Sequence, residues 1–299
     1  MNAAPITVEQ YLDALRDALR GADPALTQDA LFDAEEHLRS ELAQRPGAAE
    51  DAILRDIVAS YGAPAEVADA YLASEATVRA ALRTPAPRPR PTTLGRFFGV
   101  YADPRAYLCL LYLLLALVTG VAYFSFATIG LSLSLGLAVL IIGVPFFLAF
   151  IGTARVVALA EGRIVETLLG VRMPRRPPYR DRESPFWQRV VGMLKDPRTW
   201  STLLYLLLML PLGIFYFTFA VVGIVVSVAT ILAPILVLLY HAGLVHIEGT
   251  VQSPHPALLP LVSLLGVLLL TVTMHLARGL GYLHGQLART LLVEVRTPA

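Results

Sequence analysis

The sequence predicts an all-α membrane protein: a small cytoplasmic helical domain, followed by a polytopic transmembrane bundle built from two parallel hairpin repeats. Three observations predict this class. Of the 299 residues, 56% are hydrophobic and only 16% are charged, whereas soluble domains are about a quarter charged. No Lys or Arg occurs in residues 106–154 or 199–277, and about 20 apolar residues suffice to cross a ~30 Å hydrocarbon core. Finally, one apolar stretch is present in two copies.

Residues 1–75 are predicted to form an acidic helical domain, with fifteen acidic and five basic side chains. Apolar residues such as Tyr11 recur every three or four positions, as on one face of an amphipathic helix. We expect Thr7 to cap the first helix and Thr27 to cap the second. A break at Gly62 separates the third helix from a fourth. No apolar run opens the chain, so we expect its first residues to stay in the cytoplasm.

Three short segments of this region carry a family resemblance: "YL" at 11–12, "EHL" at 36–38 and "YGAP" at 61–64. Together they resemble the HAAS domain, a short cytoplasmic helical module of bacterial membrane proteins that is often linked to PadR-type regulators. We expect this domain to bind a cytoplasmic protein partner or to self-associate. Residues 76–95 follow as a Pro- and Arg-rich linker, which favours an extended spacer.

The rest of the chain is predicted to hold two membrane repeats, 96–175 and 176–299. The 25 residues from Asp103, "DPRAYLCLLYLLLALVTGVAYFSFA", agree at 15 positions with "DPRTWSTLLYLLLMLPLGIFYFTFA" from Asp196, 93 residues later. A second block, "TARVVALAEGRIVETLL", aligns with "LARGLGYLHGQLARTLL" at an offset of 123 residues. The second repeat therefore holds about 30 extra residues, which we place at about 224–256.

The positive charges predict the topology. All Lys and Arg residues lie in 1–105, 155–198 and 278–296, and the positive-inside rule places these segments on the cytoplasmic side. We therefore expect a multi-pass protein of the bacterial cytoplasmic (inner) membrane with both termini in the cytoplasm. Each repeat leaves the cytoplasm and returns to it, which makes the repeats parallel.

The first repeat is predicted to be a plain hairpin. Its helices are expected over 106–127 and 131–152, with a turn near Gly130 and a kink at Pro145.

The second repeat is predicted to leave over 200–222 and to return over 257–275. Between them, residues 224–240 are apolar enough to enter the membrane, either as a re-entrant segment, which we favour, or as a fifth transmembrane helix. Tyr123 and its copy Tyr216 are expected at the outer interface.

The membrane part also carries a family resemblance, in "YFSFATIGLSLSLGLAVLIIGVP", "LLGVRMP" and "LARGLGYLHGQLARTLL". These segments resemble the sensor domain found in bacterial sensor histidine kinases and in stand-alone membrane proteins, over about residues 96–295. The resemblance implies four transmembrane helices and a role in signal reception.

Candidate site residues are few. No P-loop, dinucleotide-binding, zinc-protease or nucleophile-elbow motif is present, so we expect no enzyme and no cofactor. One polar group, expected on the outer side, could hold a divalent metal, since imidazole and carboxylate are metal ligands; the alternative is that these residues only face solvent. The group consists of His241, His246, Glu248 and His255.

A basic loop follows the first repeat's second helix. Its position beside the membrane favours contact with anionic lipid headgroups, and we expect no nucleic-acid partner. The loop's arginines are Arg172, Arg175, Arg176, Arg180 and Arg182.

The favoured function is a non-enzymatic membrane signalling or regulatory protein, which senses at or in the lipid bilayer and relays to a cytoplasmic partner through residues 1–75. A transporter-type protein or accessory subunit is the alternative, and a metal-dependent membrane hydrolase is a weaker one. A homo-oligomer is compatible with the sequence.

Overall fold

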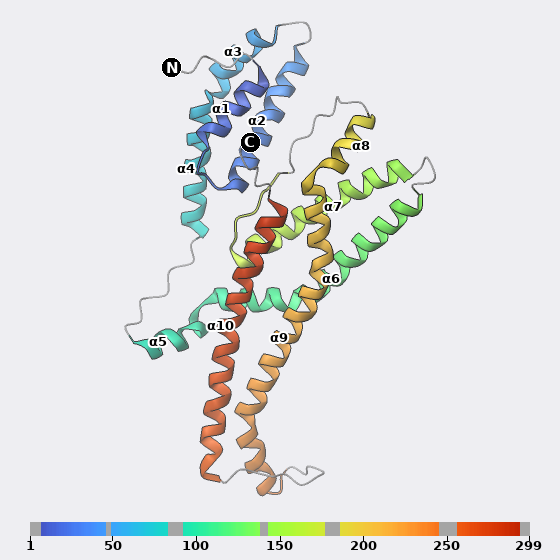
Figure 1. Cartoon of the computed structure of the whole chain (residues 1–299). Coiled ribbons are helices and arrows are strands. Elements are labelled where there is room, and N and C mark those ends of the chain that lie inside the picture. The colour runs from blue at the N-terminus through green and yellow to red at the C-terminus, as the bar shows by residue number, and fades with distance from the viewer. Residues whose placement is uncertain are drawn as a thin grey trace.

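The computed structural model describes residues 7–45, 49–82, 92–137, 143–176, 186–244 and 256–293. Every regular element within these residues is helical. A domain of four helices stands at one end of a set of long helices, as predicted (Figure 1).

The N-terminal domain consists of α1 (Val8–Ala18), α2 (Pro24–Gln44), α3 (Glu50–Tyr61) and α4 (Pro64–Leu82). The Thr7 side chain caps α1 as predicted, by accepting from the Gln10 backbone N–H at 3.2 Å. The prediction of Thr27 as the second cap is wrong. Asp23 caps α2 instead, and Pro24 occupies the first turn, where a missing N–H costs nothing.

The core of this domain is formed by the apolar faces of its helices. Tyr11 is fully buried there, and its hydroxyl donates to the Gly62 carbonyl at 2.9 Å. Gly62 lies in the turn between α3 and α4 and has a φ of +112°, a conformation that favours glycine. The hydrogen bond from Tyr11 therefore links this turn to the core of the domain.

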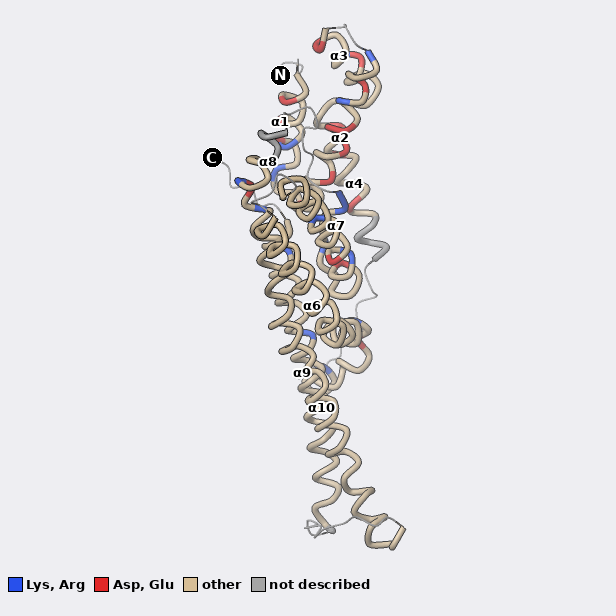
Figure 2. The backbone as a smooth tube through the Cα atoms, turned by 90° about the vertical axis from the view of Figure 1, so that its right-hand side faces the viewer, with Lys and Arg blue, Asp and Glu red and all other residues tan. Residues whose placement is uncertain are grey.

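Four long helices follow: α6 (Pro104–Leu137), α7 (Gly143–Leu169), α9 (Pro197–His241) and α10 (Leu259–Leu292). Each is long and apolar enough to cross a membrane. Short elements precede the outgoing helices: α5 (Thr93–Phe97) and the 3₁₀-helix η1 (Phe98–Ala102) come before α6, and α8 (Phe186–Lys195) comes before α9. Charged residues gather toward the N-terminal domain, and the far ends of α9 and α10 carry none (Figure 2).

The predicted turn near Gly130 is wrong, because α6 continues through it to Leu137. Gly130 instead lets α7 approach closely, since a Cβ there would lie 2.0 Å from the Phe150 ring. Pro145 lies in the first turn of α7, where proline is tolerated without the predicted kink.

The two predictions for residues 224–240 are also wrong. These residues neither re-enter the membrane nor form a separate fifth helix, because α9 runs unbroken for 45 residues through Pro211 and Pro234. At 1.5 Å per residue it is about 68 Å long, roughly twice the ~30 Å hydrocarbon core. Of the extra residues placed at about 224–256, those up to His241 therefore belong to α9.

Helices α6 and α9 cross in close backbone contact at two glycines. A Cβ on Gly120 would lie 2.4 Å from the Met209 carbonyl oxygen, and one on Gly213 would lie 2.2 Å from the Ala116 carbonyl oxygen. The two glycines are 93 residues apart, so they are equivalent in the two repeats. Small residues permit such close crossings between membrane helices.

Two equivalent ion pairs tie the repeats together. Arg278 of α10 contacts Asp103 before α6 at 2.8 Å, and Arg155 of α7 contacts Asp196 before α9 at 3.1 Å. In each pair the aspartate belongs to one repeat and the arginine to the other. The repeats thus bind each other through equivalent residues.

Candidate functional site: a buried cluster of tyrosine, glutamate and histidine

Six polar side chains meet between the four long helices. Glu161 of α7 and His284 of α10 are both 0% exposed. Two tyrosines of α6 and two of α9 surround them. We call this set the buried polar cluster: Tyr112, Tyr123, Glu161, Tyr205, Tyr216 and His284.

Two tyrosine hydroxyls bridge the glutamate and the histidine. The Tyr112 oxygen lies 2.7 Å from Glu161 Oε1 and 2.6 Å from His284 Nε2. The Tyr205 oxygen lies 3.0 Å from each of the same two atoms. Tyr123 donates to Glu161 Oε2 at 2.9 Å, and the Tyr216 hydroxyl is 3.4 Å from His284 Nδ1.

The contacts are consistent with one assignment of protons. A carboxylate only accepts, so Tyr112 and Tyr205 donate to Glu161 Oε1. Each phenol then has no further proton, and His284 Nε2 must carry the hydrogen that points to their oxygens. His284 Nδ1 is left as an acceptor for Tyr216. With Glu161 taken as a carboxylate, this assignment gives each of the six side chains a hydrogen-bond partner.

Burying an unpaired carboxylate costs several kcal/mol. The three tyrosine donors to Glu161 offset this cost, and hydrogen bonds to charged groups contribute about 1.5–3 kcal/mol each. Glu161 is therefore stabilised only while the three tyrosines stay within hydrogen-bond distance, and this depends on the packing of α6, α7 and α9.

The cluster contains the same three positions from each repeat. The 93-residue offset relates Tyr112 to Tyr205 and Tyr123 to Tyr216, and the 123-residue offset relates Glu161 to His284. At the third position the repeats differ in the kind of ionisable group. The arrangement thus combines a symmetric frame of phenols with one acid and one base.

Sequence reasoning missed this site because it placed Glu161 beyond the membrane helix, in a cytoplasmic segment. The prediction that Tyr123 and Tyr216 face the outer interface is wrong, since both hydroxyls point to the cluster. The repeat alignment was the available signal, because it pairs Glu161 with His284 and aligns the four tyrosines.

The predicted metal group remains a prediction. His241 is the last residue of α9 and is exposed, whereas His246, Glu248 and His255 lie outside the described residues. Within the described ranges, no set of three or more His, Cys, Asp or Glu side chains is placed to hold a metal ion.

The N-terminal domain contacts the basic loop through Asp29 of α2, which is 5% exposed. Its Oδ1 accepts from the backbone N–H groups of Arg175 and Arg176 at 2.6 and 2.8 Å. Its Oδ2 lies 3.2 Å from Arg172 Nη2. Burial raises the pKa of Asp29 above its ordinary value, although the two N–H groups and the Arg172 charge act in the opposite direction.

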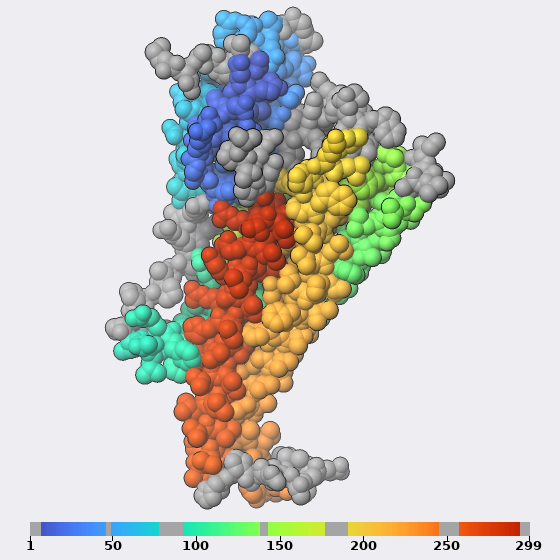
Figure 3. Space-filling view, in the orientation of Figure 1, coloured from blue at the N-terminus to red at the C-terminus, as the bar shows by residue number. Residues whose placement is uncertain are grey.

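Arg172 also ties this contact to α7 and α4. It pairs with Glu166 of α7 at 3.0 Å and with Glu75 of α4 at 3.5 Å. Arg289, near the end of α10, pairs with Asp23 at 3.3 Å, so the domain also lies against the end of that helix (Figure 3).

The remaining arginines of the loop are less enclosed. Arg176 pairs with Asp33 at 3.0 Å and is half exposed, while Arg180 and Arg182 lie outside the described residues. Contact of this loop with lipid headgroups remains a prediction.

Fold and site define a multi-pass helical membrane protein with an enclosed polar cluster between its candidate spans and an N-terminal helical domain that contacts one of its loops. The chain belongs to the family described as "Putative sensor", whose model matches residues 112–292, and the HAAS family matches residues 10–70. No curated protein and no solved structure matches the chain. Both predicted resemblances are confirmed, and they support a membrane sensing or regulatory role.

Proposed function

We propose that this chain is a non-enzymatic signalling protein of the bacterial cytoplasmic membrane, with both termini in the cytoplasm. The two repeats, 96–175 and 176–299, sense a stimulus at or in the membrane. The domain at 1–75 relays the resulting state to a cytoplasmic protein or to a second copy, and residues 76–95 tether it.

One observation carries this proposal: helix α7 joins the buried polar cluster to the domain contact. Glu161 lies in the cluster, and Glu166 holds Arg172, which in turn holds Asp29. The two glutamates are five residues apart on one helix, an axial rise of about 7.5 Å. A rotation or shift of α7 that follows a change at Glu161 therefore moves the contact that seats the N-terminal domain.

The relay is tested by measuring the position of the domain while the cluster is altered. Spin labels at Ser60→Cys and Tyr282→Cys, both exposed positions, report the distance between the domain and α10 in a Cys109→Ser background. Glu161→Gln replaces an acceptor oxygen by a donor amide and is expected to broaden or shift the distance distribution.

The matched control for this experiment is Tyr107→Phe, which removes a hydroxyl on an exposed face of α6 outside the cluster. It should leave the distribution unchanged. If Glu161→Gln in a folded protein gives the same distribution as the parent, the cluster does not control the domain, and the relay is wrong.

The topology has its own test. Leu244 follows α9 and is 72% exposed, and Ala73 is an exposed residue of α4. With Cys109→Ser as background, a membrane-impermeant thiol reagent applied to intact cells should label Leu244→Cys and should label Ala73→Cys only after lysis. The reverse pattern would invert the proposed orientation.

Transport is the second candidate function, because Glu161 and His284 lie on helices that could span the membrane. Ionisable residues in such positions often mark ion or proton paths. Acidification of proteoliposomes that contain the wild-type protein, but not of those that contain His284→Gln, would favour transport. Equal leakage of protein-free, wild-type and variant vesicles would favour sensing.

A further inference from the structure

One face of the N-terminal domain gathers three carboxylates around a single segment of the membrane part. Asp29 and Asp33 of α2 and Glu75 of α4 form this face, which we call the acidic face. The segment is residues 172–176, "RMPRR", which follows α7 and has no regular secondary structure. The contacts between them show, within one chain, what kind of segment the acidic face can bind.

Part of the recognition involves only the backbone of the segment. Asp29 Oδ1 accepts from the backbone N–H groups of Arg175 and Arg176, and the Gln28 side-chain amide donates to the Arg176 carbonyl at 2.7 Å. Every residue except proline offers both a backbone N–H and a carbonyl. These three contacts would therefore form equally well with a segment from another protein that lay along the same line.

The side-chain contacts favour arginine at two positions of the segment, four residues apart. The Arg172 guanidinium bridges a carboxylate of α2 and one of α4, at 3.2 and 3.5 Å. Arg176 Nε lies 3.0 Å from Asp33, and the Arg176 guanidinium lies 5.8 Å from the centre of the Phe32 ring. A planar guanidinium can bridge two acids or lie over an aromatic ring, whereas the ammonium of lysine is a single point charge. The acidic face is therefore suited to the pattern Arg-x-x-x-Arg.

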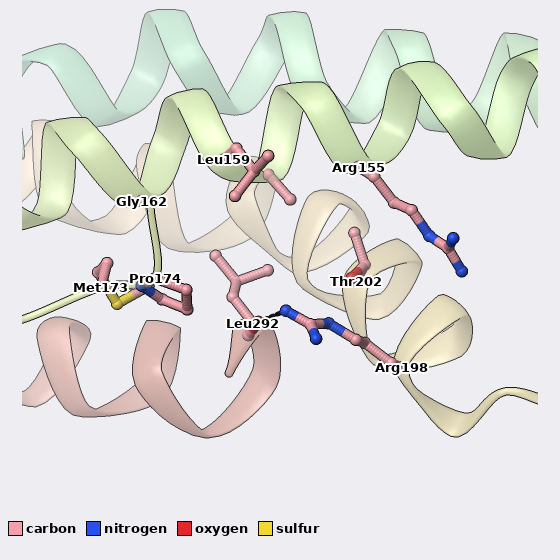
Figure 4. Close-up of a pocket in the computed structure, with 9 residues that line it drawn as sticks. Arg155, Leu159, Gly162, Met173, Pro174, Arg198, Thr202 and Leu292 are labelled. Carbon is pink, nitrogen blue, oxygen red and sulfur yellow. Dashed lines mark hydrogen bonds between the residues drawn. The ribbon is translucent and has the colours of Figure 1, made fainter. Parts of the chain in front are cut away.

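The middle of the segment packs on the membrane helices instead of on the domain. Met173 is 1% exposed, and Met173 and Pro174 lie between α7 and the end of α10, near Leu292 (Figure 4). Arg172 also pairs with Glu166 of α7 at 3.0 Å. None of these contacts involves the domain. We therefore expect the segment to stay on the membrane helices when the domain leaves, so that departure uncovers the acidic face.

We propose that the acidic face is the partner-binding surface of the N-terminal domain, and that residues 172–176 occupy it while the domain is docked. The partner is a cytoplasmic protein with an accessible segment of the same chemistry: two arginines four residues apart and backbone N–H groups beside the second. Docking and partner binding exclude each other because both use Asp29. This inference rests on the proposed relay in one respect, since the membrane helices would decide when the face is uncovered.

Competition between the chain's own segment and a partner has a measurable consequence. A ligand that binds only the undocked domain has an apparent dissociation constant equal to its intrinsic one divided by the undocked fraction. Any change that weakens the chain's own segment, but leaves the acidic face complete, therefore tightens the apparent binding of an added segment.

The test measures binding of a fluorescently labelled peptide, GVRMPRR, which has the sequence of residues 170–176, to the detergent-purified full-length protein. Arg172→Gln weakens the chain's own segment, so it should bind the peptide at least about tenfold more tightly than the wild type does. Arg172→Lys keeps the positive charge but not the bridging guanidinium, and it should tighten binding by about threefold. This milder variant keeps the test valid if Arg172→Gln does not fold.

Two controls separate the acidic face from general charge attraction. In the Arg172→Lys background, Asp29→Ala should weaken peptide binding about tenfold or more. The matched control, Asp17→Asn, removes a carboxylate of α1 that is 63% exposed, and it should change the affinity by less than about twofold. The peptide RRRGPVM has the same composition but no two arginines four residues apart, and it should bind about tenfold more weakly than GVRMPRR.

Equal affinity of the wild type and the folded Arg172 variants for the peptide would overturn the proposal, because residues 172–176 would then not compete for the face. Equal binding of the two peptides, or equal losses for Asp29→Ala and Asp17→Asn, would overturn it in favour of diffuse attraction. The assay does not involve the buried polar cluster. If Glu161→Gln leaves the domain in place while the peptide behaves as expected, the relay is wrong and the binding face stands.

Discussion

Replacing Asp29 by alanine is expected to release the N-terminal domain from the membrane bundle. The change removes the acceptor for the N–H groups of Arg175 and Arg176 and one acid partner of Arg172. Each N–H is partly buried, so leaving it unpaired costs about 1 kcal/mol, the low end of the usual range. The lost pair with Arg172 adds about 1 kcal/mol.

The loss of the buried Asp29 charge partly offsets this sum of about 3 kcal/mol. Burial raises the pKa of Asp29, which means that its charge is held at some cost in the docked state, and alanine removes that cost. We therefore expect a net loss below about 3 kcal/mol, which corresponds to a fall of up to roughly 150-fold in the docking equilibrium constant. Asp29→Asn retains one acceptor oxygen and should lose less than Asp29→Ala.

The assay is the spin-label distance between Ser60→Cys and Tyr282→Cys, in which the docked domain gives a narrow distribution and the released domain a broad one. The matched control is Arg176→Gln. It removes the ion pair between Asp33 and the Arg176 side chain, which is 52% exposed. It keeps the backbone N–H of residue 176, which Asp29 binds. An exposed pair of this kind contributes at most about 1 kcal/mol.

The comparison separates short hydrogen bonds from long-range charge attraction. Salt screens exposed charges beyond about 8 Å at physiological strength, but it affects a buried carboxylate–amide contact little. The reasoning is refuted if Arg176→Gln releases the domain as fully as Asp29→Ala does. Release of the wild-type domain by 1 M salt alone would refute it too.

Three further changes test the packing. Gly213→Ala places a Cβ against the backbone of α6 and should cost about 1–3 kcal/mol in thermal unfolding, whereas Gly136→Ala, in open space on α6, should be neutral or slightly stabilising. Tyr112→Phe should cost about 1–3 kcal/mol because it removes a donor from buried Glu161, and the exposed Tyr107→Phe should cost under about 0.5 kcal/mol in the same assay. Burial raises the pKa of Tyr11 above 10.0, so the folded domain holds that phenol proton more tightly than the unfolded chain. Its contribution to stability is complete below pH 10 and is lost as the pH rises above it. Tyr11→Phe should therefore reduce the alkaline loss of stability in circular-dichroism titrations, and part of the loss should remain because burial also raises the pKa of Tyr61 and Tyr71.

The sequence by itself determined the helical class, the N-terminal domain and the presence of membrane-spanning helices. These features depend on local properties: apolar runs long enough to span a bilayer, and a three- to four-residue spacing of apolar side chains. The same local patterns did not mark the ends of helices inside apolar runs. Gly130 looks like a turn in sequence and is a contact point for Phe150 in the fold, because a helix in an apolar environment keeps its backbone hydrogen bonds.

Only the tertiary structure decided where the functional groups meet. Glu161 and His284 are 123 residues apart, and nothing in the sequence near either residue indicates that two tyrosines bridge them. Their meeting depends on how α6 and α9 cross at Gly120 and Gly213, a geometry set by backbone contact between distant residues. The same holds for Asp29 and Arg172: the opposite charges of the domain and the loop indicate attraction, but the choice of partners depends on shape, burial and hydrogen-bond direction.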